Sequence, residues 1–221
     1  MTPSEQGKPS PARSEPATGP IGGQLAFLVR GLLLRFRLTS LVARHDSTVV
    51  MAAFSLVNGC VSIGLMATAA LVSGQPFVFP SLGPTAFLFF YAPLSASASP
   101  RNAILGHLVG ACAGWVSLAA FGLLDAGPAL ATGVDTSRVG AAALSLGLTS
   151  GLMVLLRVPH PPAGATTLII SLGILRTPVQ IVVLMSAVVL LVAQAIVINR
   201  LAGLDFPYWA HRSAPGDYKP R

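Results

Sequence analysis

Two short segments interrupt strongly apolar sequence with prolines, glycines and hydroxyl-bearing residues. The first reads PSLGPT at residues 80–85, and the second reads PHPPAGATT at residues 159–167. Proline has no backbone N–H to donate and pushes the preceding residue toward extended geometry, so a regular helix cannot run through either segment. A helix can begin where each segment ends, and the sequence predicts Gly83 and Gly164 as the two N-terminal caps.

The start of a helix is a natural place for a negative ion. Its first N–H groups lack helical partners and its dipole is positive there, and both properties attract anions. Hydroxyl groups beside each break add hydrogen-bond donors without adding charge. We therefore predict a site for a small anion between the two helix starts. Its predicted residues are Ser81, Gly83, Thr85, His107, His160, Gly164, Thr166 and Thr167.

Two members of this set, His107 and His160, are ionisable side chains inside apolar stretches of the sequence. An ionisable group within a membrane is costly and is therefore a candidate for function, and histidine titrates near neutral pH. Proton coupling is one interpretation of this pair. The alternative is that each histidine only ties down a broken backbone or a contact between helices, and the sequence leaves both interpretations open.

The sequence around these residues has the composition of a membrane protein. It is 53% hydrophobic and only 10% charged, whereas soluble proteins are near one quarter charged. No Asp, Glu, Lys or Arg occurs between Asp46 and Arg101, and the windows 102–124, 139–156, 158–175 and 177–199 are equally free of them. A helix of about 20 apolar residues spans a bilayer. We therefore predict an all-α, polytopic transmembrane helix bundle.

The order of the segments indicates an internal repeat. Four full spans are expected at about residues 49–72, 102–124, 139–156 and 178–198, with the two broken segments between them. Both broken segments contain the pattern P-x-x-G-x-T, beginning at Pro80 and Pro161, at an offset of 81 residues. The same offset moves the first span onto the third and the second roughly onto the fourth. The sequence thus favours a 3+3 repeat with two half-helices.

Each broken segment is long enough to cross a membrane. Half extended and half helical, the two would reach about 32 Å and about 36 Å, against a hydrocarbon core of about 30 Å. The alternative is a re-entrant loop that returns to its own side, which gives four crossings instead of six. Six crossings obey the positive-inside tendency better, because Arg101 and Arg157 then lie on the cytoplasmic side.

Small residues recur at four-residue intervals in two of the spans. Gly106, Gly110 and Gly114 form one series, and Gly147 and Gly151 form another. This spacing lets helix backbones approach each other closely. The same faces permit a homo-oligomer, although no feature of the sequence fixes its number.

The ends of the sequence carry most of its positive charge, and the formal net charge is +7. We expect residues 1–20 to be a disordered tail, 21–46 an amphipathic helix on the membrane surface, 47–200 the transmembrane domain and 201–221 a cytoplasmic tail. Attraction to anionic lipid explains this charge better than nucleic-acid binding. The expected location is a bacterial inner membrane, with both termini cytoplasmic and with the lipid bilayer and a small anion as partners. Cys60 and Cys112 fall in apolar spans and are expected to be free, buried thiols.

The run HPPAGATTL at residues 160–168 resembles the signature of the HPP family of integral membrane proteins. The resemblance includes FPSLGPTA at 79–86, SPRN at 99–102 and GHLVG at 106–110, and it extends over residues 45–200. Members occur in bacteria, fungi and plants, and plastid-type relatives are linked to nitrite transport. The resemblance therefore implies a transporter or channel for a small inorganic anion, with nitrite as the first candidate.

Two other classes of function remain to be compared with transport. An intramembrane enzyme needs a nucleophile with a base, or a set of metal ligands. The sequence contains no HExxH or GxSxG motif, and every acidic residue lies outside the spans, so we expect no catalytic, cofactor-binding or metal-binding residues. A non-transporting assembly or sensor subunit is the alternative function.

Overall fold

Helices form the regular structure of the computed structural model, which describes residues 37–211. The predicted tail at 1–20, most of the predicted surface helix at 21–46 and the last residues of the predicted C-terminal tail lie outside the described residues. The helices are α2 (Leu38–Val42), α3 (Ser47–Ser73), α4 (Leu82–Tyr91), η1 (Ala96–Ala98), α5 (Pro100–Ala120), α6 (Ala129–Thr132), α7 (Thr136–Leu155), α8 (Ala163–Ser171) and α9 (Pro178–Leu201). Residues 37–211 contain no strand, so the all-α prediction is confirmed.

Four helices, α3, α5, α7 and α9, are long and apolar enough to cross a membrane. They contain 27, 21, 20 and 24 residues, which correspond to about 30–40 Å of helix. Their positions agree with the four predicted spans to within a few residues. The chain is therefore a multi-pass integral membrane protein.

Polar residues at the starts of these four helices explain where they begin. The side chain of Asp46 accepts hydrogen bonds from the first turn of α3, and Asp135 does the same for α7. Ser99 caps α5, and Thr177 forms a capping box with Gln180 at the start of α9; in both helices a proline follows the cap. Such caps satisfy N–H groups that have no partner within the helix.

The two short helices, α4 and α8, follow the proline-rich breaks, as predicted, but each begins earlier than predicted. The residue before α4 is Ser81, and the residue before α8 is Pro162. Gly83 and Gly164 are therefore not caps and lie within the first turns. The reason is that proline is compatible with the first turn of a helix, so the prolines join these turns.

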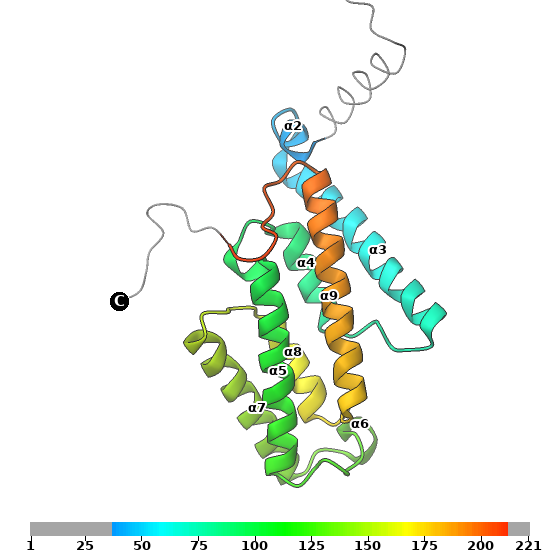
Figure 1. The fold of residues 1–221 in the computed structure, drawn as a ribbon, viewed down its shortest axis with the longest axis vertical. Coiled ribbons are helices and arrows are strands. Elements are labelled where there is room, and N and C mark those ends of the chain that lie inside the picture. Colours follow the sequence, from blue (N-terminus) through cyan, green and yellow to red (C-terminus); the bar gives the residue numbers. More distant parts are fainter. Residues whose placement is uncertain (1–36, 212–221) are drawn as a thin grey trace, which may run out of the picture. The chain divides into compact units, whose positions relative to one another are not determined.

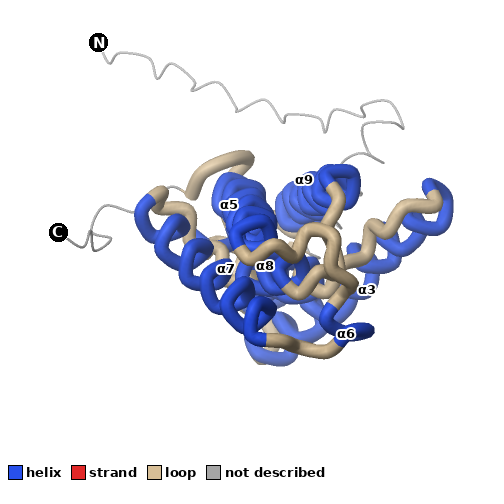
Figure 2. The backbone as a smooth tube through the Cα atoms, turned by 90° about the horizontal axis from the view of Figure 1, so that it is seen from below, coloured by secondary structure: helices blue, strands red, loops and turns tan. Residues whose placement is uncertain are grey.

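The long helices surround the short ones. Helix α5 packs against α7, α8 and α9, while α3 packs against α4 and α9. Figure 1 shows α4 running upward and α8 running downward from the middle of the bundle. Figure 2 shows α8 in the interior and α3 at the outer edge. The first turns of the two half-helices thus come together near the centre.

The second broken segment extends along the whole length of α5. At one end, the Arg101 side chain, in the first turn of α5, donates a hydrogen bond to the carbonyl of Arg157. At the other end, the Arg176 side chain donates to the carbonyl of Ala126, which lies beyond the end of α5. This path is the one expected of a crossing segment, whereas the number of crossings and the internal repeat stay predictions.

The glycines of α5 let α8 and His160, in the break before it, approach closely. A Cβ atom added at Gly106 would lie 2.7 Å from Cβ of His160, and one at Gly110 would lie 2.7 Å from the carbonyl oxygen of Ala163. A Cβ at Gly114 would lie 2.8 Å from the carbonyl oxygen of Thr167. The predicted close approach is confirmed for this series. Gly147 and Gly151 have no such neighbour within 4 Å among the described residues.

The outward faces of the bundle are apolar, as a lipid-facing surface requires. Leu71 and Val72 of α3 are 85% and 83% exposed on the chain. Cys60 and Cys112 also lie on exposed faces, without a disulfide. The prediction that these thiols are buried was wrong, because an apolar span does not specify which of its faces packs against protein.

Candidate functional site

Two histidines and two threonines form a buried polar cluster where α4, α5 and α8 meet. Nδ1 of His107 lies 2.6 Å from Oγ1 of Thr166, and Nε2 of His107 lies 2.9 Å from Oγ1 of Thr85. Nε2 of His160 lies 3.3 Å from the same Thr85 oxygen. All four side chains are fully buried. The structure thus brings together four of the eight predicted site residues, which come from four different segments of the chain.

His160 is fixed by its second ring nitrogen. Nδ1 donates a hydrogen bond of 2.8 Å to the carbonyl oxygen of Ser97 in η1. Because a carbonyl can only accept, this contact assigns a hydrogen to Nδ1 of His160. The Asn102 side chain holds η1 by donating to the carbonyl of Ala96 at 2.9 Å. The position of His160 therefore depends on the turn before α5 as well as on the proline break.

Ring packing and the α5 glycines fix the rest of the geometry around His160. The centroids of the His107 and His160 rings are 4.9 Å apart, with the rings tilted by 58°. Phe89 of α4 lies against His160 at a centroid distance of 6.5 Å. Only a glycine at 106 leaves room for the His160 side chain. In this conformation the cluster is closed to solvent on every side.

The first N–H groups of α8 are not free for an anion. The amides of Ala163, Gly164 and Ala165 donate to the carbonyls of His160, Pro161 and Pro162 at 3.0–3.1 Å. The expectation of unpaired N–H groups at this helix start was therefore wrong. Three successive tight turns through the two prolines supply the carbonyls. The donors that remain for a ligand are side chains.

The other predicted site residues have different surroundings. Ser81 and Thr167 are fully buried, and their hydroxyls have no partner among the described residues. Gly83 is exposed, with no neighbour within 4 Å of an added Cβ in the described part of the chain. A Cβ added at Gly164 would lie 3.5 Å from Cδ1 of Leu146 in α7. Neither glycine contributes a polar group to the cluster.

The cluster carries no fixed charge. Asp46, Asp125, Asp135 and Asp205 are the acidic residues of the described chain, and all four lie outside the helices. Arg101 and Arg157 lie at one end of the bundle, joined by a hydrogen bond of 3.1 Å. The buried Arg138 donates to the carbonyls of Ser171 and Gly127. Residues 37–211 contain no group of three or more His, Cys, Asp or Glu side chains suited to a metal ion.

Sequence reasoning missed two contributors to the cluster. The Ser97 carbonyl leaves no signal in the sequence, because every residue has a carbonyl and only the fold directs this one at His160. Asn102 did leave a signal, since it stands at the start of an apolar span after a serine and a proline. A polar residue in that place is expected to bind the preceding turn.

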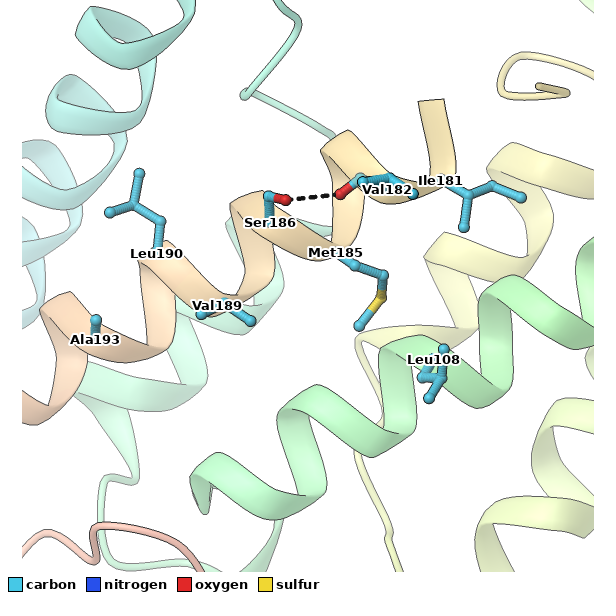
Figure 3. A pocket seen from close by; sticks show the side chains of 8 residues that line it. All are labelled: Leu108, Ile181, Val182, Met185, Ser186, Val189, Leu190 and Ala193. Atoms are coloured by element: carbon cyan, nitrogen blue, oxygen red, sulfur yellow. Dashed lines mark hydrogen bonds between the residues drawn. The ribbon is translucent and has the colours of Figure 1, made fainter. Parts of the chain in front are cut away.

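The outer surface of the bundle offers a groove of a different kind. It has a volume of about 620 Å³ and is lined by Leu108, Ile181, Val182, Met185, Ser186, Val189, Leu190 and Ala193. Figure 3 shows that Ser186, its one hydroxyl, is already bonded to the carbonyl of Val182. An apolar groove on a lipid-facing surface suits an acyl chain and not an ion. The buried cluster is therefore the better candidate site.

Comparison with known proteins places the chain in a membrane family. The family described as HPP, transmembrane region, matches residues 44–207. A transmembrane protein of Dictyostelium discoideum is 37% identical over 93 residues, which cover 42% of this chain and 27% of that protein. A second one from the same organism is 29% identical over 146 residues, covering 63% of this chain and 48% of that protein. The chain thus spans between about a quarter and half the length of these relatives. No solved structure matches it.

Proposed function

The chain belongs to the HPP transmembrane family, and from this premise we propose that it moves a small inorganic anion across a membrane, with nitrite as the first candidate. The observation that carries the proposal is the meeting of two half-helices at a buried His–Thr cluster within an otherwise apolar bundle. Buried polar groups within a membrane are costly, and in transporters they mark the path of the substrate. The proposed setting is a bacterial inner membrane with both termini on the cytoplasmic side.

Side chains provide the hydrogen bonds for the anion in this proposal. The hydroxyls of Ser81 and Thr167 are buried without partners, and a ligand would satisfy them. The hydroxyls of Thr85 and Thr166 and the two imidazole rings form the buried cluster, and Ser81 and Thr167 stand one helical turn before Thr85 and next to Thr166 in the sequence. The positive dipole ends of α4 and α8 favour a negative charge there. A small anion fits such a set better than a cation, because the site contains no carboxylate.

The cluster is closed in this conformation, so transport requires it to open alternately to the two sides. Arg101 and Arg157, at one end of the bundle, suit the attraction of an anion to that entrance. The α5 glycines present no side chains of their own to α8, which lies in close contact with them. We propose movement of α8 against α5 as the opening step.

Anion flux into proteoliposomes tests the proposal. Nitrite, nitrate and chloride are each offered at neutral pH, where nitrite is already almost entirely ionised and crosses bare lipid slowly, and flux into protein-free vesicles is subtracted. We expect saturable nitrite uptake by the wild type and at least about a tenfold loss in Thr166→Val, which removes one hydroxyl from the cluster. Thr68→Val, on the exposed face of α3, is the matched control and should transport normally.

Absence of flux for all three anions in protein shown to be folded would contradict the proposal. A flux-silent protein that purifies together with a partner would instead support the alternative of an assembly or sensor subunit.

A further inference from the structure

The hydroxyl of Thr85 lies within hydrogen-bond distance of three groups but has only one hydrogen to donate. Its oxygen lies 3.0 Å from the Ser81 carbonyl, 2.9 Å from Nε2 of His107 and 3.3 Å from Nε2 of His160. A hydroxyl has one hydrogen to donate and two lone pairs to accept with. The carbonyl can only accept. All three contacts can therefore be hydrogen bonds only when Thr85 donates to Ser81 and both imidazole nitrogens donate to Thr85.

This requirement decides the protonation state of the histidines. His107 meets it as a neutral ring, with its hydrogen on Nε2 and with Nδ1 accepting from the Thr166 hydroxyl at 2.6 Å. His160 already uses a hydrogen on Nδ1 for the Ser97 carbonyl. It can donate from Nε2 as well only when it carries a second proton. The geometry around Thr85 thus contains a place for one additional proton, on His160.

The neutral state of the cluster is also accommodated. With no hydrogen on Nε2 of His160, the Thr85 hydroxyl turns from the Ser81 carbonyl and donates to that nitrogen instead. If His107 took the proton instead, the Thr85 hydroxyl would still have to donate to Nε2 of His160. The Ser81 carbonyl would then lack the hydrogen bond from Thr85. Rotation of one hydroxyl therefore accompanies gain or loss of the proton at His160, and the helices need not move.

A proton on His160 would have no fixed counter-charge. Helix α4 faces it with Thr85 and Phe89, α5 with His107, and η1 with the Ser97 carbonyl. The charged residue nearest to His160 in the sequence is the cation Arg157, whose carbonyl accepts a hydrogen bond from Arg101, and no acidic side chain in the described chain contacts the cluster. A buried charge is costly unless it is paired. An anion in the site would supply that pair.

From these observations we propose that His160 binds one proton together with the anion, so that the protein is an anion–proton cotransporter. The inference rests on the proposed function and adds its coupling ion. The bound proton makes the site favourable for an anion, and the bound anion makes the site favourable for a proton, because linkage between two ligands is reciprocal. The pair crosses with no net charge, so the membrane potential does not oppose entry of the anion.

Proton uptake by purified protein is the first test. Sodium nitrite is added to the detergent-solubilised full chain in weakly buffered solution that contains a pH indicator. We expect uptake of about one proton per chain in the wild type, and none in His160→Gln, whose amide can still donate but cannot gain a proton. His45→Gln, on an exposed residue outside the bundle interior, is the matched control and should behave as the wild type.

The second test combines flux with proton movement. Vesicles that contain the wild type and an internal pH dye receive nitrite, and nitrite and proton uptake are recorded together against protein-free vesicles. Nitrite flux without protein-dependent proton uptake overturns the cotransport proposal and leaves the anion function standing. Nitrite-driven proton uptake in detergent without any flux supports the linked site and contradicts the transport function.

If His160→Gln fails to fold, a measurement on the wild type alone still tests whether nitrite binding protonates a buried histidine. Nitrogen NMR of the 15N-labelled histidines distinguishes neutral from doubly protonated rings. We expect one ring to become doubly protonated when nitrite is added at constant pH. Two buried rings that stay neutral in the presence of nitrite would overturn the proposal.

Discussion

The hydrogen bond between Thr166 and His107 lies in the protein interior, where solvent does not reach either side chain. Both side chains are fully buried, and their atoms lie 2.6 Å apart. Loss of one member leaves the other desolvated and without a partner, which usually costs more than the bond itself contributes. At the residue scale, the cluster is therefore structural as well as functional.

We predict that Thr166→Val lowers the free energy of unfolding by about 1–3 kcal/mol, because Nδ1 of His107 is left without a partner. Thermal unfolding of the purified protein in detergent measures the effect. Thr149→Val is the matched control, since that threonine is also fully buried but its hydroxyl has no partner in residues 37–211. Equal losses in the two variants would contradict the assigned bond.

The sequence indicated the residues of the cluster better than their roles. Prolines and apolar flanks pointed to both breaks, and Thr85, His107, His160 and Thr166 do meet. The glycine caps were wrong because a proline can belong to the first turn of a helix. The free N–H groups of α8 were wrong because the preceding turns through Pro161 and Pro162 supply carbonyl partners. The spacing of residues in the sequence does not determine which backbone carbonyl accepts a hydrogen bond from an imidazole ring.

Helix α8 is the element on which the site depends most. With nine residues it is too short to be stable alone, so its position comes from packing. One of its sides lies on the α5 glycines, and its C-terminal end faces the buried Arg138. A cation at that end also interacts favourably with the helix dipole.

We predict that Gly110→Ala lowers the free energy of unfolding by about 1–3 kcal/mol, because the new methyl group meets a backbone carbonyl that cannot move aside. Gly147→Ala adds the same methyl group in α7, where no described atom lies within 4 Å. We expect that control to be neutral or slightly stabilising, since alanine favours the helix. Both are measured by thermal unfolding in detergent. Equal tolerance of the two substitutions would show that α8 does not pack on the α5 glycines in solution.

We predict that Arg138→Met lowers the free energy of unfolding by at least about 2 kcal/mol, because the carbonyls of Ser171 and Gly127 lose a charged donor. Arg138→Lys should recover part of the stability, because an ammonium group can reach one carbonyl but lacks the planar fork. Unfolding midpoints of the three proteins check the order. A methionine variant as stable as the wild type would rule out this support for α8.

The sequence predicted the elements well where charge or proline marks an end. The predicted start of α9 agrees with the observed start at Pro178. The apolar run that contains α8 continues to Leu175, whereas the helix ends at Ser171. Gly173 ends the helix locally: it adopts a left-handed conformation (φ 79°), and the N–H groups of Gly173 and Ile174 donate to the carbonyls of Ile170 and Ile169. The Arg138 side chain also donates to the Ser171 carbonyl at this end. Such a contact is not visible in a hydropathy pattern.

At the scale of the whole molecule, the path of the chain bears on the number of crossings. The segment that contains α8 begins beside the start of α5 and ends beyond the end of α5. We propose six crossings, of which two are made by a broken segment with its half-helix. This arrangement would place Arg101 and Arg157 on the same side of the membrane as both termini.

Cysteine accessibility checks this topology. The background protein carries Cys60→Ala and Cys112→Ala, because both native thiols lie on exposed faces. Single cysteines at Leu94, Arg157 and Thr177 are then treated with an impermeant maleimide from each side. We predict that Leu94 and Arg157 react from one side and Thr177 from the other. Reaction of Arg157 and Thr177 positions from the same side would establish a re-entrant loop.

The most direct test of the site is a distance measurement between nitrite and the histidine rings in a lipid bilayer. Solid-state NMR with 15N-nitrite and 13C-labelled histidine detects such proximity as a loss of carbon signal. We predict that the ring carbons of His107 and His160 lose signal, and that Thr166→Val reduces the effect. Transport of nitrite by a protein whose two buried histidines show no such proximity would place the anion elsewhere and contradict the account.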